Sequence, residues 1–164
     1  MSATDKLTPA YASAGLETFA QAMYQAAGME QDKAQTVARL QVLTDGMGRM
    51  THGLAMAPLY LKEIDKGTMT PRGQPEVVRD NGHSAVWDGA YLPGLWLVDE
   101  AIKVAMPRAA KTGMAAIAIR RSHIARWSSR SSSVSISRSR GVRRSAAATG
   151  SPVFWDGSRA RPDK

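Results

Sequence analysis

The amino-acid usage of this chain changes abruptly near residue 124, which limits where a folded core can form. All ten leucines, all nine methionines and every glutamate of the 164 residues precede that point. Residues 124–164 hold 11 of the 15 serines, with nine Lys/Arg against two Asp/Glu. Residues 1–123 carry thirteen Lys/Arg and twelve Asp/Glu, so the net charge of +8 belongs almost wholly to the last part.

The Ser/Arg-rich stretch predicts disorder over residues 126–164, because it offers too little apolar surface to offset the entropy of ordering it. Its composition also fits wrong-frame translation of GC-rich DNA, so we expect the chain to read out of frame after about Ile124 or Ala125. We therefore expect three segments: a helical region over 1–70, a partial α/β domain over 71–125, and the disordered tail.

Three amphipathic helices are predicted in the first region. Apolar residues recur at steps of three and four over residues 13–27, 30–44 and 51–66. Pro58 falls in the second turn of the third helix, where we expect it to bend the axis. Lys62 and Glu63 are expected on an exposed face of that helix.

Short strands and one more helix follow. Residues 76–79 and 84–87 predict a hairpin, residues 95–111 a helix that Pro107 kinks or ends early, and residues 114–119 a buried strand, which can lie parallel to a neighbour. The fold class predicted is α/β (α+β-like). The polar residues that follow the last strand are Arg120, Arg121, Ser122 and His123. Open α/β sheets commonly place ligand groups at this end of a strand.

A glycine-rich turn over residues 45–53 separates the second and third helices. Thr51 can cap the third helix, which would place its hydroxyl and the His52 imidazole at a helix N-terminus suited to a carboxylate. From the residues alone, an ordinary helix–loop–helix corner with a surface histidine remains the alternative.

Several classes of site are disfavoured. The chain has no cysteine, so it can form no disulfide and no thiolate site. His52, His83 and His123 lack metal-ligand spacing, so no metal site is expected, and His83 is interpreted as a solvated loop residue. Asp88-Gly89 is interpreted as turn chemistry. No signal peptide or membrane-spanning run is visible, and we expect a cytoplasmic protein without a membrane partner.

Short motifs occur in a characteristic order between residues 45 and 123. They comprise Asp45, Gly46, Gly48, Thr51, His52, Gly53, Leu54, Tyr60, Gly67, Val86, Trp87, Asp88, Gly89, Gly94, Gly113, Ser122 and His123. Over about residues 10–125, this order and spacing resembles the N-terminal part of the type-2 malate/L-lactate dehydrogenase family. That family also includes ureidoglycolate and sulfolactate dehydrogenases and imine reductases acting on cyclic 2-carboxylates.

The resemblance implies hydride transfer between NAD or NADP and a small 2-hydroxy/2-oxo acid, in a homodimer with a non-Rossmann cofactor site. Consistent with that, no G-x-G-x-x-G follows a strand here. By position, Thr51 and His52 match the family's substrate-contacting pair, and Tyr60 its substrate-pocket tyrosine. His123 matches its general acid/base, and imidazole suits proton transfer near neutral pH.

Two departures from the family are visible. Many members carry an arginine four residues after the first histidine to clamp the substrate carboxylate, whereas Met56 stands here. Arg49, Arg120 or Arg121 could substitute for it. The cofactor-binding residues are expected beyond residue 125, where the Ser/Arg-rich tail stands instead, so we expect a truncated, inactive form.

An alternative from another class is a nucleic-acid or partner-binding module that uses the Arg/Ser tail. Such tails bind phosphate backbones electrostatically, and Trp127 and Trp155 could stack on bases. The confinement of the charge to a segment without a predicted fold argues against it. A steep salt dependence of binding, lost on deleting residues 126–164, would favour this module over the enzyme.

Overall fold

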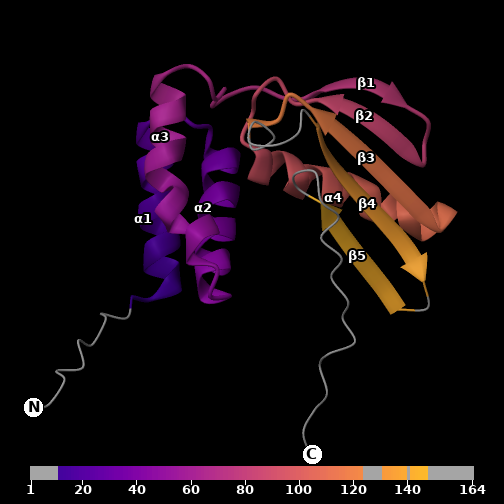
Figure 1. The fold of residues 1–164 in the computed structure, drawn as a ribbon, viewed down its shortest axis with the longest axis horizontal. Coiled ribbons are helices and arrows are strands. Elements are labelled where there is room, and N and C mark those ends of the chain that lie inside the picture. The colour runs from indigo at the N-terminus through magenta and orange to yellow at the C-terminus, as the bar shows by residue number, and fades with distance from the viewer. Residues whose placement is uncertain (1–10, 124–130, 140, 148–164) are drawn as a thin grey trace, which may run out of the picture.

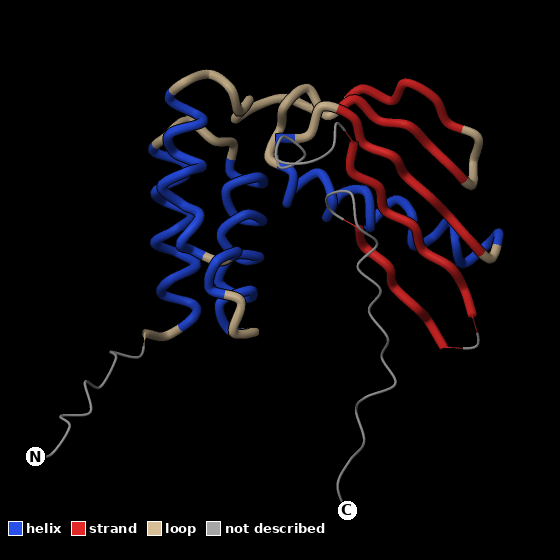
Figure 2. The backbone as a smooth tube through the Cα atoms, in the orientation of Figure 1, coloured by secondary structure: helices blue, strands red, loops and turns tan. Residues whose placement is uncertain are grey.

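The computed structural model describes residues 11–123, 131–139 and 141–147, which form a helical part beside a mixed β-sheet (Figures 1 and 2). The elements are α1 (Ser13–Ala26), α2 (Gln31–Gly46), the 3₁₀ turns η1 (Met50–His52) and η2 (Leu54–Met56), α3 (Ala57–Asp65), β1 (Glu76–Asp80), β2 (Ser84–Asp88), α4 (Gly94–Thr112), β3 (Met114–Arg120), β4 (Ser131–Ser139) and β5 (Gly141–Ala147). This mixed architecture confirms the predicted α/β class.

The third helix begins later than the sequence predicts. Residues 50–56 form the two 3₁₀ turns, and α3 starts at Ala57 with Pro58 in its first turn, so the proline opens the helix instead of bending it. Thr51 caps neither η2 nor α3. The backbone N–H of Leu54 instead donates to Asp45 Oδ2 at 2.9 Å, so a carboxylate from the end of α2 holds this corner.

The sheet has the order β1-β2-β3-β4-β5. β1 and β2 form the predicted antiparallel hairpin, and β3 is the predicted buried strand, parallel to β2. α4 connects these two parallel strands and packs against the sheet (Figure 1). Pro107 lies inside α4, which continues to Thr112, so the expected early end is wrong.

Part of the stretch expected to be disordered is described as strands. β4 pairs antiparallel with β3, and β5 pairs antiparallel with β4. The sequence Ser-Val-Ser-Ile-Ser over 133–137 alternates apolar and polar residues with the period of a strand, and the edge of β3 offers backbone N–H and C=O groups to it. The high Ser/Arg content of the segment predicted disorder, although residues 133–137 alternate as a strand does. The rest of 126–164 lies outside the described residues.

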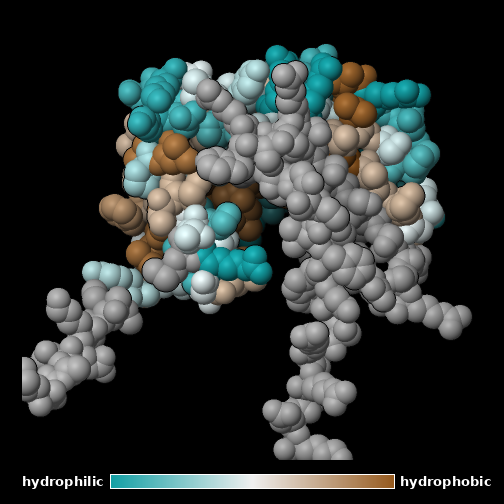
Figure 3. All heavy atoms as spheres, in the orientation of Figure 1, coloured by the Kyte–Doolittle hydropathy of each residue, from teal (hydrophilic) through white to brown (hydrophobic). Residues whose placement is uncertain are grey.

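The hydrophobic core runs without a break from the helices into the sheet. Tyr24 and Val37 from the helical part belong to the same buried cluster as Leu97 of α4 and Ile117 and Ile119 of β3. The outer surface of the helical part also exposes apolar side chains, seen as brown areas in Figure 3. Within the described residues, no helix is long and apolar enough to cross a membrane.

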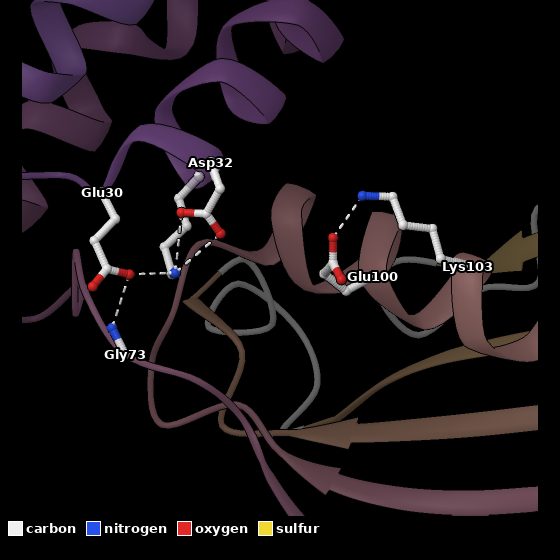
Figure 4. Close-up of polar contacts among 6 residues, drawn as sticks. Glu30, Asp32, Gly73, Glu100 and Lys103 are labelled. Carbon is white, nitrogen blue, oxygen red and sulfur yellow. Dashed lines mark hydrogen bonds and ion pairs between the residues drawn. The ribbon is translucent and has the colours of Figure 1, made fainter.

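A buried lysine joins the helical part to the sheet. The Lys33 side chain of α2 is 0% exposed, and its Nζ lies 2.5 Å from Glu30 Oε2 and 4.1 Å from the centre of the Trp96 ring on α4. Asp32 adds a second carboxylate at 3.4 Å, and Glu30 Oε2 also accepts the backbone N–H of Gly73 at 3.2 Å (Figure 4). Lys33 therefore ties α2 to α4 and to the loop that precedes β1.

Candidate functional site

His123 lies where the loop after β3 meets α3. Its side chain is 8% exposed, and its Nε2 lies 3.3 Å from Glu63 Oε2. The Tyr60 ring packs edge-on against the imidazole, with 6.1 Å between the ring centres. The structure thus brings together two of the residues predicted from the sequence, His123 and Tyr60, and adds Glu63.

Glu63 is held in place independently of His123. Thr68 Oγ1 donates to Glu63 Oε2 at 2.6 Å, and the backbone N–H groups of Thr68 and Met69 both donate to the Glu63 carbonyl at 3.0 Å. The hydrogen bond from Thr68, followed by that from His123, keeps the pKa of the Glu63 carboxyl below its ordinary value. Glu63 is therefore an anion at neutral pH and can stabilise an imidazolium.

The prediction that Glu63 belongs to an exposed helical face is wrong, because His123, in the segment after β3, lies against it. The Glu63 side chain is only 14% exposed. The sequence held one usable signal: Glu63 follows Tyr60 by three residues, so a helix places both on the same face. No local pattern reveals that a residue 60 positions further along the chain packs there.

Tyr60 forms the inner wall of the site. It is 3% exposed, and burial raises the pKa of its phenol. Behind it, the Tyr24 ring lies 6.0 Å away, and the Tyr24 hydroxyl donates to Gln41 Oε1 at 2.6 Å. Burial raises the pKa of Tyr24 to about 12, so both phenols retain their protons at neutral pH. The two tyrosines therefore line the site with buried, uncharged rings.

The loop after β2 and the loop after β3 interlock through backbone hydrogen bonds. Gly89 N–H donates to the Arg120 carbonyl at 2.8 Å and Tyr91 N–H to the Arg121 carbonyl at 2.6 Å. The last hydrogen bond between the two loops is from the His123 N–H to the Leu92 carbonyl, at 3.3 Å. The backbone of His123 is thus aligned by the segment 89–92.

Gly89 lies where the two loops approach each other and α4 most closely. A Cβ built there would lie 2.6 Å from Leu97 Cδ1 and 3.3 Å from the carbonyl oxygens of Arg120 and Arg121. We expect Gly89→Ala to lower the free energy of unfolding by about 1–3 kcal/mol, because the added methyl overpacks a fully buried position. Urea denaturation measures the loss.

Gly15→Ala is the matched control for that substitution, because nothing lies within 4 Å of a Cβ at Gly15 and the residue sits in α1. It should raise stability by about 0.5–1 kcal/mol through helix propensity. Equal changes in both variants would show that residue 89 is not tightly packed.

Asp88 anchors the same two loops through its side chain. The carboxylate is 1% exposed and accepts Arg121 Nε at 2.8 and 2.9 Å, Arg120 Nε at 2.7 Å and the Ala90 N–H at 3.0 Å. The hydrogen bond from Arg121 is the largest cause that lowers the pKa of this carboxyl. Asp88-Gly89 does form a turn, as predicted, but the turn is tied to the residues that precede His123.

The stability that Asp88 contributes should depend on pH. Its pKa in the folded state lies below the ordinary value of about 3.9, so the contribution is complete above pH 4 and is lost as the pH falls towards the folded-state pKa. We expect Asp88→Asn to destabilise the chain at pH 7, and the gap to the parent chain to narrow below pH 4. Urea unfolding of both proteins between pH 3 and 7 tests this, and a gap that widens in acid would contradict it.

Thr51 and His52 occupy a different place. Both are exposed in η1, where Thr51 Oγ1 lies 2.9 Å from His52 Nδ1. η1 precedes the first turn of α3, whereas Glu63 lies in the last turn. Thr51 and His52 thus pair with each other in η1, whereas the Tyr60 ring and Glu63 lie against His123.

The arginines that could replace the family's carboxylate clamp also differ in setting. Met56 packs against the core, and Arg49 is exposed. Arg120 and Arg121 are both engaged by Asp88 through Nε, while about half of each side chain remains exposed. Among the described residues, no group of three or more His, Cys, Asp or Glu side chains is arranged to hold a metal ion.

Comparisons with known proteins place this geometry in a family. A family model described as malate/L-lactate dehydrogenase matches residues 11–131. Hydroxycarboxylate dehydrogenase B of Escherichia coli O157:H7 is 28% identical over 108 residues, which cover 66% of this chain and 30% of that protein. L-lactate dehydrogenase of Cupriavidus necator is 32% identical over 92 residues, covering 56% of this chain and 26% of that protein.

Solved structures show the same fold. Malate dehydrogenase from Pyrococcus horikoshii superposes with a TM-score of 0.69 at 23% identity, covering 74% of this chain and 35% of that one. The matched region is therefore only about a third of the length of these relatives. The family match spans most of the described residues and includes Tyr60, Glu63, Asp88 and His123. The chain belongs to the malate/L-lactate dehydrogenase family.

Proposed function

We propose that this chain carries the proton-transfer part of an NAD(P)-dependent oxidoreductase that interconverts a 2-hydroxy acid and a 2-oxo acid. His123 is the proton donor and acceptor, and Tyr60, Thr51 and His52 contact the substrate. The observation that supports this best is the pairing of a nearly buried imidazole with an anchored carboxylate, His123 with Glu63, beside an apolar tyrosine wall.

The chemistry asked of His123 follows from this pairing. When a 2-oxo acid is reduced, its carbonyl oxygen becomes an alkoxide unless a proton arrives, and an imidazolium can supply one near pH 7. Ionised Glu63 stabilises the imidazolium before the transfer. In the reverse direction the neutral imidazole accepts the hydroxyl proton, and the same carboxylate favours that acceptance.

The described residues do not provide a recognisable nicotinamide site. Gly46 ends α2 and Gly48 follows it in the turn before η1, so these glycines do not connect a strand to a helix. We propose that the cofactor is held by the part of the family fold that residues 11–123 do not cover. The 164-residue chain alone should therefore neither bind NAD or NADP tightly nor turn over, and the choice of cofactor, the acid and a homodimeric assembly belong to the complete fold.

A fusion protein tests the proposal. Residues 11–123 replace the matching segment of E. coli hydroxycarboxylate dehydrogenase B, and circular dichroism verifies folding. The fusion is assayed with a panel of 2-hydroxy acids and either NAD or NADP, with the 164-residue chain alone as the baseline. We expect the fusion to oxidise at least one of these acids, whereas a folded fusion without activity towards any of them would contradict the proposal.

A further inference from the structure

We propose that Asp88 is a positioning residue for His123, acting through the two interlocked loops that end β2 and β3. This inference rests on the proposed role of His123 as the proton donor and acceptor. The Asp88 carboxylate is already engaged by Arg120, Arg121 and the Ala90 N–H, so it acts through these groups. Asp88 sets the position of the backbone that carries the His123 imidazole.

The loops around Asp88 adopt an unfavourable backbone conformation. Ala90, Tyr91 and Arg121 have φ values of 46°, 61° and 52°, and they are the only non-glycine residues with positive φ among those the structure describes. A side chain in this left-handed region costs energy and persists only where the surroundings enforce it. Besides the backbone hydrogen bonds between the two loops, one carboxylate holds residues on both sides, because Asp88 accepts the Ala90 N–H and the Arg121 guanidinium.

The effect of this anchor converges on His123 by two routes. The first is direct: Arg121 precedes His123 by two residues, and the His123 N–H is fixed by Leu92 at the end of the loop that Asp88 organises. The second runs through α3, because the Tyr91 carbonyl accepts the Thr70 N–H at 3.0 Å, next to the segment whose Thr68 holds Glu63. Release of Asp88 should therefore disturb both the imidazole and its acid partner.

A purely stabilising ion pair elsewhere on the same sheet provides the matched control. Asp80, at the other end of the β1–β2 hairpin, accepts Arg108 Nη1 at 2.8 Å and Nη2 at 2.6 Å. Its carboxylate also accepts the Gly82 N–H at 2.8 Å, within the turn of the same hairpin. Asp80→Asn should reproduce the loss of an Asp–Arg pair without the effect on His123.

The test uses the 164-residue chain and reads each imidazole separately. The chain has only three histidines, and His52 and His83 are exposed internal references. Diethyl pyrocarbonate modification is followed by peptide mass spectrometry, and the imidazole signals of each histidine are recorded by NMR. In Asp88→Asn we expect His123 to be modified about tenfold faster and its NMR signals to move towards those of the exposed histidines, because the loops that enclose it open more often. His52, His83 and the Asp80→Asn protein should be unchanged.

Two outcomes would overturn the inference: an unchanged His123 in folded Asp88→Asn, or an equal change in Asp80→Asn. If Asp88→Asn does not fold, Arg121→Lys decides by the same criteria, because it keeps the charge and removes the Nε donor. Neither readout involves hydride transfer. A failure of the proposed enzyme activity therefore leaves this test intact, and an unchanged His123 leaves the activity proposal intact.

Discussion

Asparagine in place of His123 is expected to lower kcat for 2-hydroxy acid oxidation by about 10²–10⁴-fold in the fusion protein described above. The amide is close in size to imidazole and can still form hydrogen bonds with Glu63, but it cannot carry a proton at neutral pH. Because substrate binding does not need that proton, KM should change little. Steady-state rates between pH 5 and 9 measure the effect, and the ionisation of His123 should disappear from the profile.

His83→Asn is the matched control for that substitution. His83 is exposed in the turn between β1 and β2, and we expect its replacement to leave kcat and KM unchanged. If His123→Asn retains the parent kcat, another group donates the proton. A rise in KM alone would instead assign His123 to substrate binding.

Lys33→Ala should lower the free energy of unfolding by about 2–5 kcal/mol, the range measured when a buried methionine or leucine is truncated to alanine. The side chain is fully buried, so truncation leaves a cavity against Trp96. It also removes the contact that joins α2 to α4, and separation of the helical part from the sheet should then require less denaturant.

Lys33→Met separates packing from charge at the same position. Methionine fills the same space, and the carboxylates of Glu30 and Asp32 are 40% and 53% exposed, so water can solvate them once the ammonium is gone. We expect a change below about 1.5 kcal/mol for this variant. Urea denaturation of the two variants side by side measures the difference, and equal losses would show that the charge, not the packing, holds the junction.

Local patterns predicted the elements well where one period governs a segment. The β1–β2 hairpin and the buried strand β3 follow from alternation and from a short apolar run, and both are present in the expected order. The start of α3 was predicted too early because two helix starts fit the sequence: one capped by Thr51 and one with Pro58 in its first turn. Asp45 decides between them by accepting the Leu54 N–H, and that bond joins residues nine positions apart.

In the candidate site, too, local patterns identify some residues, and contacts between distant residues decide the roles of others. His123 could be singled out because it follows a buried strand and resembles a family residue. Asp88 also belongs to the motifs that resemble the family, but it was interpreted as turn chemistry because its contact with Arg121 joins residues 33 positions apart. Glu63 could not be singled out, because its contact with His123 joins residues 60 positions apart. A sequence pattern reports which face of a helix is apolar, but not which distant loop will cover its polar residues.

The most direct test of the account follows the imidazole signals of His123 by NMR while oxamate, a non-reducible analogue of a 2-oxo acid, is added to the fusion protein together with the cofactor that it uses. We expect the His123 signals to shift in a saturable manner and the His83 signals to remain unchanged, because the carbonyl oxygen of a 2-oxo acid must lie beside the group that protonates it. A titration that leaves His123 unmoved up to the highest soluble concentration of oxamate would contradict the assignment of this imidazole to a 2-oxo acid site.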